Sequence, residues 1–439
     1  MKNMENIISK MAVMAASALV LCIGAVSCED EPDKYRATGG VPSITYIRPA
    51  DVNASDSLLT GAYMGNAICI VGDNLRSIYQ LWFNDQQATL NTSYITDHTL
   101  LVDVPNKIPA EVSNKIYMYN KKGDVTEYDF NVLVPGPTIS SMSCEWAKAG
   151  SEATIYGDYF IDDPNVPITI TFPENVPVTQ ITEINKNYVR FVVPEGATEG
   201  KVDISTIYGS VSSDFQYMDS RGMLFEFDGL TGLTNHGWHA QVIETDDNAL
   251  SGNYLRLGDP GVTMDEAGGW NDGNFSFEYW PGDWNDPTEY NGTDKKLTDL
   301  VDFSDWENMS LKFEMCIPSS NPWGAGMMQL IVAGVDKVSG GMSTSTGAGA
   351  NNTFFQDSAL PRGVYQPWSS TKMFDTADEW ITVTVPYSNF IYGFDGSAAA
   401  GSLTADDFTS LTIFVVGGPT GQECQPVIKI DNIRAVPNK

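Results

Sequence analysis

The sequence predicts an all-β protein in which two small antiparallel sandwiches precede a larger β-sandwich of jelly-roll type. Three observations lead to this prediction. Apolar and polar residues alternate over short runs that are rich in β-branched side chains and are separated by glycine and proline. A set of residues recurs once along the chain, and most tryptophans lie in the last half. We therefore expect folded domains at residues 42–134, 135–218 and 219–439, after a leader at 1–27 and a tether at 28–41.

The first 28 residues have the pattern of a lipoprotein export signal. Lys2 and Lys10 precede an apolar run from Met11 to Val26, which is short for a membrane span, and small residues lead to Cys28. Cys28 would become the first mature residue and receive a lipid that anchors the chain. The acidic run at 29–33 resembles the tag of surface-exposed Bacteroidetes lipoproteins. We expect a lipid-anchored protein on the outside of the outer membrane; the alternative is an ordinary secretory signal with a chance cysteine.

Composition and charge restrict the function classes. The chain has 439 residues and a net charge of −31, which argues against nucleic acid and other polyanions as partners and suits a neutral or cationic ligand. Aromatic residues make up 11%, so the acidity does not indicate disorder. Cys69, Cys144, Cys316 and Cys424 have no metal-ligand spacing. Cys69 is expected to be a buried thiol, and a bridge between Cys316 and Cys424 stays open.

The first two domains are copies of one unit. The run Ala67-Ile-Cys-Ile-Val-Gly-Asp73 matches Ala153-Thr-Ile-Tyr-Gly-Asp158, and Thr99–Pro105 matches Tyr188–Pro194, each ending in Val-Pro. Each copy opens with proline shortly before isoleucine, at Pro42 and Pro137. These residues resemble the IPT/TIG family of immunoglobulin-like domains. The resemblance implies two immunoglobulin-like sandwiches that act as spacers.

The third domain combines predicted strands with many aromatic residues. Alternation predicts strands at Leu311–Ile317, Gln329–Ala333, Trp380–Pro386, Leu411–Val416 and Val427–Ile433. Eight of the ten tryptophans fall here, at 238, 270, 280, 284, 306, 323, 368 and 380. The closing run Ile428-Lys-Ile-Asp-Asn-Ile433, with Pro322-Trp323 and Trp380-Ile-Thr-Val383, resembles the C-terminal domain of surface glycan-binding proteins. That resemblance implies a glycan-binding jelly roll.

A glycan site needs flat aromatic faces for the sugar rings and polar side chains for the hydroxyls. Trp323 follows Asn-Pro and precedes Gly-Ala-Gly, a loop context in which an indole has little local cover, and we expect its loss to weaken binding while the fold stays intact. A long, glycine-rich loop without strand pattern runs from Val338 to Trp368. The resemblance assigns the platform to Trp323 with Phe354 and Phe355. A rival alignment uses Tyr365 and Trp368, so the expected ligand-binding residues are Trp323, Phe354, Phe355, Tyr365 and Trp368.

Other tryptophans are assigned by their local context. Trp306 and Trp380 border alternating strands and are expected in the core. The segment from Trp270 to Tyr290 is a second candidate wall of the site, or a cover for a sheet face.

Catalytic signals are weak. Jelly-roll β-glucanases carry Glu-x-Asp-x-x-Glu on one strand, and here the corresponding run from Glu226 through Asp228 ends in Thr231, so the proton donor is missing. His236-x-x-His239 lacks the glutamate of a zinc-protease motif, and the only other histidine is His98. We expect no enzyme activity, no cofactor and no catalytic metal.

The sequence thus favours a non-catalytic surface lipoprotein that captures a neutral β-linked plant polysaccharide, such as xyloglucan, mixed-linkage glucan or mannan. Its other expected partner is an outer-membrane glycan importer, with membrane contact through the lipid alone. The alternatives are a surface adhesin that recognises protein and a jelly-roll glycoside hydrolase.

Overall fold

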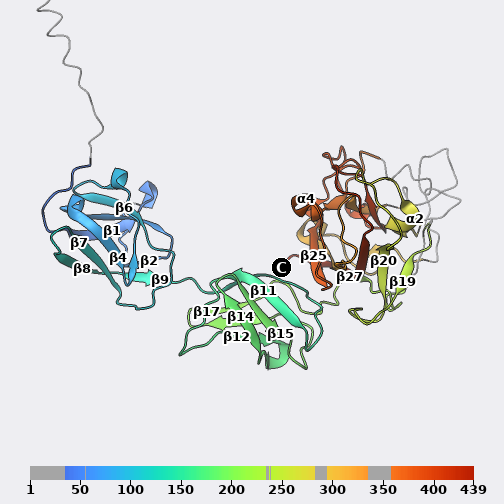
Figure 1. The fold of residues 1–439 in the computed structure, drawn as a ribbon, viewed down its shortest axis with the longest axis horizontal. Coiled ribbons are helices and arrows are strands. Elements are labelled where there is room, and N and C mark those ends of the chain that lie inside the picture. Colours follow the sequence, from blue (N-terminus) through green and yellow to red (C-terminus); the bar gives the residue numbers. More distant parts are fainter. Residues whose placement is uncertain (1–34, 55, 234–236, 238, 282–293, 335–356) are drawn as a thin grey trace, which may run out of the picture. The chain divides into compact units, whose positions relative to one another are not determined.

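The computed structural model describes residues 35–54, 56–233, 237, 239–281, 294–334 and 357–439. Strands dominate these residues, and the α-helices among them are two single turns, α2 (Asp272–Phe275) and α4 (Trp368–Thr371). The all-β prediction is confirmed. The chain divides into one unit that ends at Pro135 and a second, Gly136–Lys439 (Figure 1). Within the described ranges, no helix is long and apolar enough to cross a bilayer.

The first unit is a sandwich of two main sheets. One has the strand order β1-β3-β6 and the other the order β5-β4-β7-β8, while β2 and β9 form a small parallel pair. Ile47, Ile70, Leu81 and Phe83 are among the residues of its core. The strands and 3₁₀ turns are β1 (Ser43–Pro49), η1 (Val52–Ala54), β2 (Gly61–Tyr63), β3 (Ala67–Asp73), η2 (Leu75–Ser77), β4 (Ile78–Phe83), β5 (Gln86–Gln87), η3 (Thr92–Tyr94), β6 (Thr99–Asp103), β7 (Lys115–Asn120), β8 (Val125–Asp129) and β9 (Asn131–Leu133).

The second unit begins with another sandwich of the same design. Its sheets have the orders β10-β11-β15-β14 and β13-β12-β16-β17. The elements are β10 (Thr138–Met142), β11 (Glu152–Asp158), β12 (Thr169–Phe172), η4 (Pro173–Asn175), β13 (Val176–Pro177), β14 (Ile181–Asn185), β15 (Tyr188–Val192), β16 (Asp203–Thr206) and β17 (Gly209–Ser212).

The repeated Gly-Asp pair marks the same structural feature in both copies. Gly72 lies opposite Ile44, and Gly157 lies opposite Ile139, each at a β-bulge between the first two strands. A Cβ atom on either glycine would lie 1.9 Å from a carbonyl oxygen of the neighbouring strand. Glycine is therefore required at both positions, which explains why the motif recurs.

The C-terminal domain is a sandwich of two antiparallel sheets. One has the order β19-β20-β27-β22-β25, with β18 also paired to β27, and the other has the order β21-β26-β23-β24. Phe313, Met328, Ile413 and Ile430 belong to the core between them. The strands are β18 (Met223–Phe225), β19 (Val242–Glu244), β20 (Tyr254–Gly258), β21 (Ser276–Tyr279), β22 (Met309–Cys316), β23 (Met327–Ala333), β24 (Gly363–Tyr365), β25 (Ile381–Pro386), β26 (Ser410–Val416) and β27 (Val427–Pro437), and the 3₁₀ turns are η5 (Leu297–Asp299), η6 (Trp306–Asn308), η8 (Tyr387–Asn389) and η9 (Ala405–Asp407).

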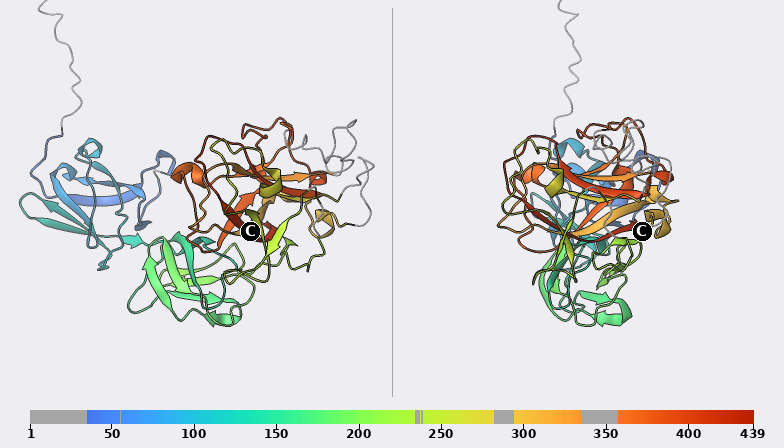
Figure 2. Two further views of the ribbon diagram at one scale, coloured as in Figure 1. Left: turned by 45° about the vertical axis from the view of Figure 1, so that its right-hand side comes forward. Right: turned by 90° about the vertical axis from the view of Figure 1, so that its right-hand side faces the viewer.

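The second sandwich belongs to the same compact unit as the C-terminal domain (Figure 2), and the two share a hydrophobic core. Tyr254, Cys316 and Trp380 of the larger domain belong to the same buried cluster as Phe172 and Tyr217 of the sandwich. Trp380 is therefore a core residue, as its context predicts. Trp306 also packs against the main core, although it is only partly buried.

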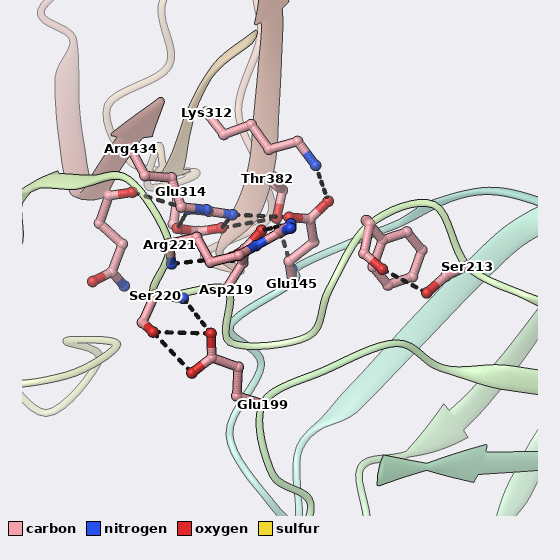
Figure 3. A network of polar contacts seen from close by, with 12 residues as sticks. Glu145, Glu199, Ser213, Asp219, Ser220, Arg221, Lys312, Glu314, Thr382 and Arg434 are labelled. Carbon is pink, nitrogen blue, oxygen red and sulfur yellow. Dashed lines mark hydrogen bonds and ion pairs between the residues drawn. The ribbon is translucent and has the colours of Figure 1, made fainter. Parts of the chain in front are cut away.

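A buried ionic network crosses this junction (Figure 3). Glu145 of the sandwich accepts hydrogen bonds from Lys312 Nζ at 2.6 Å and from Arg434 Nη2 at 2.9 Å. Arg434 also binds both carboxylate oxygens of Glu314, at 2.7 and 3.1 Å, and Thr382 donates to Glu314 at 3.0 Å. Two carboxylates and two cations thus neutralise one another on the outer face of the β22–β27 sheet.

Candidate functional site

The predicted platform residues lie together, but inside the domain. Trp323 is 0% exposed and Trp368 is 3% exposed, while Tyr365 is half-buried with its ring centre 6.3 Å from that of Trp323. Burial raises the pKa of Tyr365 to about 12. All three pack against the main core. Phe354 and Phe355 lie outside the described residues, and so does Cys28, so their predicted roles stay predictions.

The expectation that Trp323 lacks cover is wrong, because the following turn folds back onto the indole. Its Nε1 atom donates to the carbonyl oxygens of Ala325 at 2.7 Å and Gly326 at 3.0 Å. Trp368 Nε1 donates to the same Gly326 oxygen at 3.0 Å. The glycine that seemed to leave the indole open instead has a φ of +76°, which a side chain would strain. Neither indole offers surface to a ligand.

The loop predicted from Val338 to Trp368 also contains regular structure. Residues 363–365 form β24, which pairs with β23 so that Tyr365 lies opposite Met328. This pairing draws Tyr365 towards the core and gives the sheet its edge strand. The part of the loop up to residue 356 lies outside the described residues.

The outer face of the β21-β26-β23-β24 sheet carries a different aromatic group. Phe277, Met328 and Ile413 face the main core, so Glu278, Gln329 and Phe414 alternate to the other side. Trp270, in the loop before α2, packs edge-on against Phe414 with ring centres 4.7 Å apart. Phe394 lies 6.3 Å from Trp270. We call Trp270, Phe394 and Phe414, with the polar residues that hold them, the Trp270 site.

Trp270 is the exposed member of this site. It is 37% exposed, and among the described tryptophans it alone is classed with the exposed large hydrophobic residues. Trp280, which the sequence also placed in this wall, is 0% exposed and donates from Nε1 to Thr412 Oγ1 at 2.8 Å. Trp284 lies outside the described residues. The described part of the second candidate wall therefore holds one exposed indole, Trp270, and one buried indole, Trp280.

Buried polar side chains fix the aromatic residues in place. Gln329 Nε2 donates to the carbonyl oxygen of Phe394 at 3.1 Å, and Arg362 Nη1 donates to Gln329 Oε1 at 2.7 Å. The Arg362 guanidinium lies 5.9 Å from the centre of the Phe394 ring. Burial lowers the pKa of Arg362 to about 10, with Asp357 opposing the shift, so the side chain stays charged near neutrality. Such support pre-organises a binding surface.

Asp272, two residues after Trp270, and His239, which contacts Asp272, are polar groups of a kind that can bind hydroxyls. Asp272 begins α2, and His239 contacts it through Nε2 at 3.5 Å. His239 Nδ1 lies 2.9 Å from Glu278 Oε1 on the adjacent strand β21. Both His239 and Asp272 are partly exposed. An indole beside a carboxylate and an imidazole offers the apolar face and the hydrogen-bonding groups that a sugar requires.

Most residues of this site have no distinguishing pattern in the sequence. Trp270 stands between Gly269 and Asn271, a loop context that resembles the one around Trp323, so local pattern could not separate the exposed indole from the buried one. Phe394 and Gln329 show no distinguishing pattern, because the contacts that join them come from segments far apart in the chain.

The opposite outer face, on the β22–β27 sheet, packs against the second sandwich. Glu145 and the shared core of the second sandwich cover it. The described residues include no group of three His, Cys, Asp or Glu side chains that could hold a metal ion. Cys69, Cys144, Cys316 and Cys424 are free and buried, which confirms a buried Cys69 and leaves Cys316 and Cys424 unbridged.

Comparisons with known proteins agree with this architecture. Residues 217–437 match the family described as surface glycan-binding protein B xyloglucan binding domain, and residues 137–221 match the IPT/TIG domain family. The crystal structure of the surface glycan-binding protein PbSGBP-B from Prevotella bryantii is 48% identical, with a TM-score of 0.77, over 91% of this chain and 100% of that chain.

A curated relative extends the likeness over a shorter stretch. An IPT/TIG domain-containing protein of Bacteroides ovatus is 27% identical over 210 residues, which are 44% of this chain and 42% of the relative. The matched stretch spans less than half of that relative's length. From the match over residues 217–437 and the likeness to PbSGBP-B, the chain belongs to the surface glycan-binding protein B family.

Proposed function

We propose that this protein is a non-catalytic surface lipoprotein that binds a neutral β-linked polysaccharide through its C-terminal domain. The observation that carries the proposal is the match of residues 217–437 to a family described as a xyloglucan-binding domain. The 48% identity to PbSGBP-B, a surface glycan-binding protein, supports the same class of ligand. Xyloglucan is therefore the first candidate, with mixed-linkage glucan and mannan as related polymers.

The Trp270 site is where we place the sugar. One outer sheet face packs against the second sandwich, and the other is covered by its own buried cluster, so the placement rests on Trp270, the exposed indole beside that cluster. The partly exposed indole would stack on a pyranose, and Asp272 and His239 would bind its hydroxyls. Phe354 and Phe355 stay predicted contributors. The net charge of −31 suits a neutral polymer and repels an anionic one.

Glu226 and Asp228 are the carboxylate pair that most resembles a hydrolase motif, and both accept hydrogen bonds that stabilise the local structure. Glu226 is buried and accepts hydrogen bonds from the backbone N–H groups of Asp228, Gly229, Leu230 and Thr231. Asp228 in turn accepts from the backbone and side chain of Asn253. Carboxylates bound in this way stabilise a turn and are poorly placed to attack a glycosidic bond, which supports a binding function without hydrolysis.

We place the protein on the cell surface, anchored through a lipid on Cys28 and acting beside an outer-membrane glycan importer. The leader pattern and the acidic run after Cys28 support this location. Replacing Cys28 by alanine should move the protein out of the membrane fraction. If the variant stays with the membranes, the anchor assignment is wrong.

Affinity electrophoresis tests the function most cheaply. The mature chain should migrate more slowly through gels that contain xyloglucan, whereas xylan or an anionic pectin should slow its migration less or leave it unaltered. Prolonged incubation with the retarding polymer should release no reducing ends. Release of reducing ends would identify a hydrolase, and unaltered migration in every gel would favour a protein-binding adhesin.

A further inference from the structure

Figure 1 shows strands β4, β7 and β8 of the first sandwich. The outer face of the β5-β4-β7-β8 sheet to which they belong carries a second aromatic surface. Trp82 on β4 lies opposite Tyr117 on β7, and Gln80 lies opposite Tyr119. The residues between them, such as Leu81 and Met118, point into the core, so these four side chains share the outer face. All four are partly exposed.

These residues line a groove of about 510 Å³. That volume falls within the usual range for small-ligand sites. The remaining walls are polar and include two acids but no lysine, arginine or histidine; the full lining is Gln80, Trp82, Asn84, Asp85, Glu111, Ser113, Tyr117 and Tyr119. Three rings beside amides, hydroxyls and carboxylates suit a neutral, hydroxyl-rich ligand, and the two acids disfavour an anionic one.

Asn84, at the wall of the groove, has an unused hydrogen-bond donor. The side chain is 5% exposed, and its Oδ1 atom accepts from the backbone N–H groups of Ser113 at 3.1 Å and Asn114 at 2.8 Å. Within the part of the chain that the structure describes, its Nδ2 atom has no hydrogen-bond partner. A buried donor without a partner is unfavourable, and a ligand hydroxyl that enters the groove as the wall adjusts would relieve it.

The second sandwich shows that the fold does not require aromatic residues on this face. Its strands β12 and β16 correspond to β4 and β7, and there Thr171 lies opposite Asp203 while Thr169 lies opposite Ser205. Cross-strand aromatic pairs can stabilise a sheet, but this copy forms the same pairing with small polar residues. The aromatic cluster of the first sandwich therefore needs an explanation beyond folding, and partly exposed aromatic groups of this kind mark binding surfaces.

We propose that this groove is a second glycan-binding site, which takes a short stretch of a neutral polysaccharide. Neighbouring strands are about 4.8 Å apart and alternate residues of one strand about 6.8 Å apart, so the three rings cover an area comparable to one or two sugar units. The inference rests on the proposed function for its class of ligand. It adds a binding site in a domain for which the IPT/TIG resemblance implies only a spacer role. Two sites on one chain would strengthen retention on a polymer.

The test replaces the aromatic residues by those of the second sandwich. Trp82→Thr with Tyr119→Ser introduces the residues found at Thr171 and Ser205, so the fold should tolerate them. Tyr94→Ser, at an exposed tyrosine outside the groove, is the matched control. Thermal unfolding should show that both variants keep the fold. Titration calorimetry of the mature chain with xyloglucan oligosaccharides should give two sites for wild type and for Tyr94→Ser, and one for the groove variant.

A second arm separates this inference from the proposed function. A chain with Trp270→Ala should keep weak retardation in a xyloglucan gel, and adding the groove substitutions should abolish it. One site in wild type that the groove substitutions leave unchanged would overturn the inference while the proposed function stands. Binding that the groove substitutions abolish and Trp270→Ala does not affect would support the groove and overturn the Trp270 site. A wild-type chain that binds no glycan would overturn both.

Discussion

The ionic network at the junction predicts a large effect for one substitution, Arg434→Met. Arg434 is 0% exposed and makes two hydrogen bonds to Glu314 and one to Glu145. Although burial alone would lower the pKa of Arg434, the two carboxylates raise it, so the guanidinium is charged. Methionine fills much of the same volume but leaves Glu314 with Thr382 as its only remaining side-chain partner in the network of Figure 3.

The magnitude follows from the charge that is left behind. Two carboxylates and two cations give a neutral network, and without Arg434 it carries one uncompensated negative charge in a buried site. Breaking a buried ion pair in this way costs about 3–5 kcal/mol of unfolding free energy. Because Glu314 can relieve the cost by taking up a proton, and burial already raises its pKa, the deficit should grow as the pH rises from 5 to 8.

Urea unfolding followed by tryptophan fluorescence measures this effect, because eight of the ten tryptophans lie in the C-terminal domain. The matched control is Arg190→Met, which removes an ion pair of similar length, 2.9 Å to Glu183, on the surface of the second sandwich and in the same unit as Arg434. An exposed pair contributes roughly 0–1 kcal/mol. If Arg434→Met costs no more than Arg190→Met, the network does not stabilise the junction and our reasoning about burial is wrong.

Two further substitutions test the description of the C-terminal core. Asp431 is buried, and desolvation, together with the nearby Glu314, Asp228 and Glu226, raises its pKa to about 8. The folded state therefore holds a proton that the unfolded state releases above pH 4, so stability should fall between pH 4 and 8, by up to about 1.4 kcal/mol per pH unit. Asp431→Asn should flatten this decline in urea unfolding at several pH values, and an unchanged slope would contradict the shift. Trp323→Ala should lower the unfolding free energy by about 3–5 kcal/mol, because the indole is fully buried and its N–H is hydrogen-bonded; a variant of native stability that lost glycan binding would instead restore Trp323 as a platform residue.

The strands of the C-terminal domain were predictable because alternation and β-branched residues reflect burial on a sheet. The expected strand at Leu411–Val416 is β26, Ser410–Val416, and the expected strand at Gln329–Ala333 is β23, Met327–Ala333. The repeated Gly-Asp pair was equally informative, since only glycine fits the close approach of two backbones at the bulge. These features depend on residues that are close in the sequence or on the two-residue alternation of apolar and polar side chains in a strand.

Exposure of the tryptophans was not predictable, because it depends on tertiary contacts. Trp323 and Trp270 both lie in glycine-containing loops, yet backbone carbonyl groups cover the first while the second lies on the outer face of a sheet. Glu145 is a similar case. It is one of 56 acidic residues, and nothing in its neighbourhood indicates that it binds Lys312 and Arg434 in the next domain.

The central claim is that a neutral glycan binds at Trp270, and titration calorimetry with a xyloglucan oligosaccharide tests it directly. Trp270→Ala should weaken binding at the C-terminal site by at least about tenfold, since a central aromatic contact contributes about 2 kcal/mol or more. Trp306→Ala, at a partly buried tryptophan packed against Phe408 in the same domain, should leave that affinity unchanged. Equal affinities for wild type and Trp270→Ala would contradict the account.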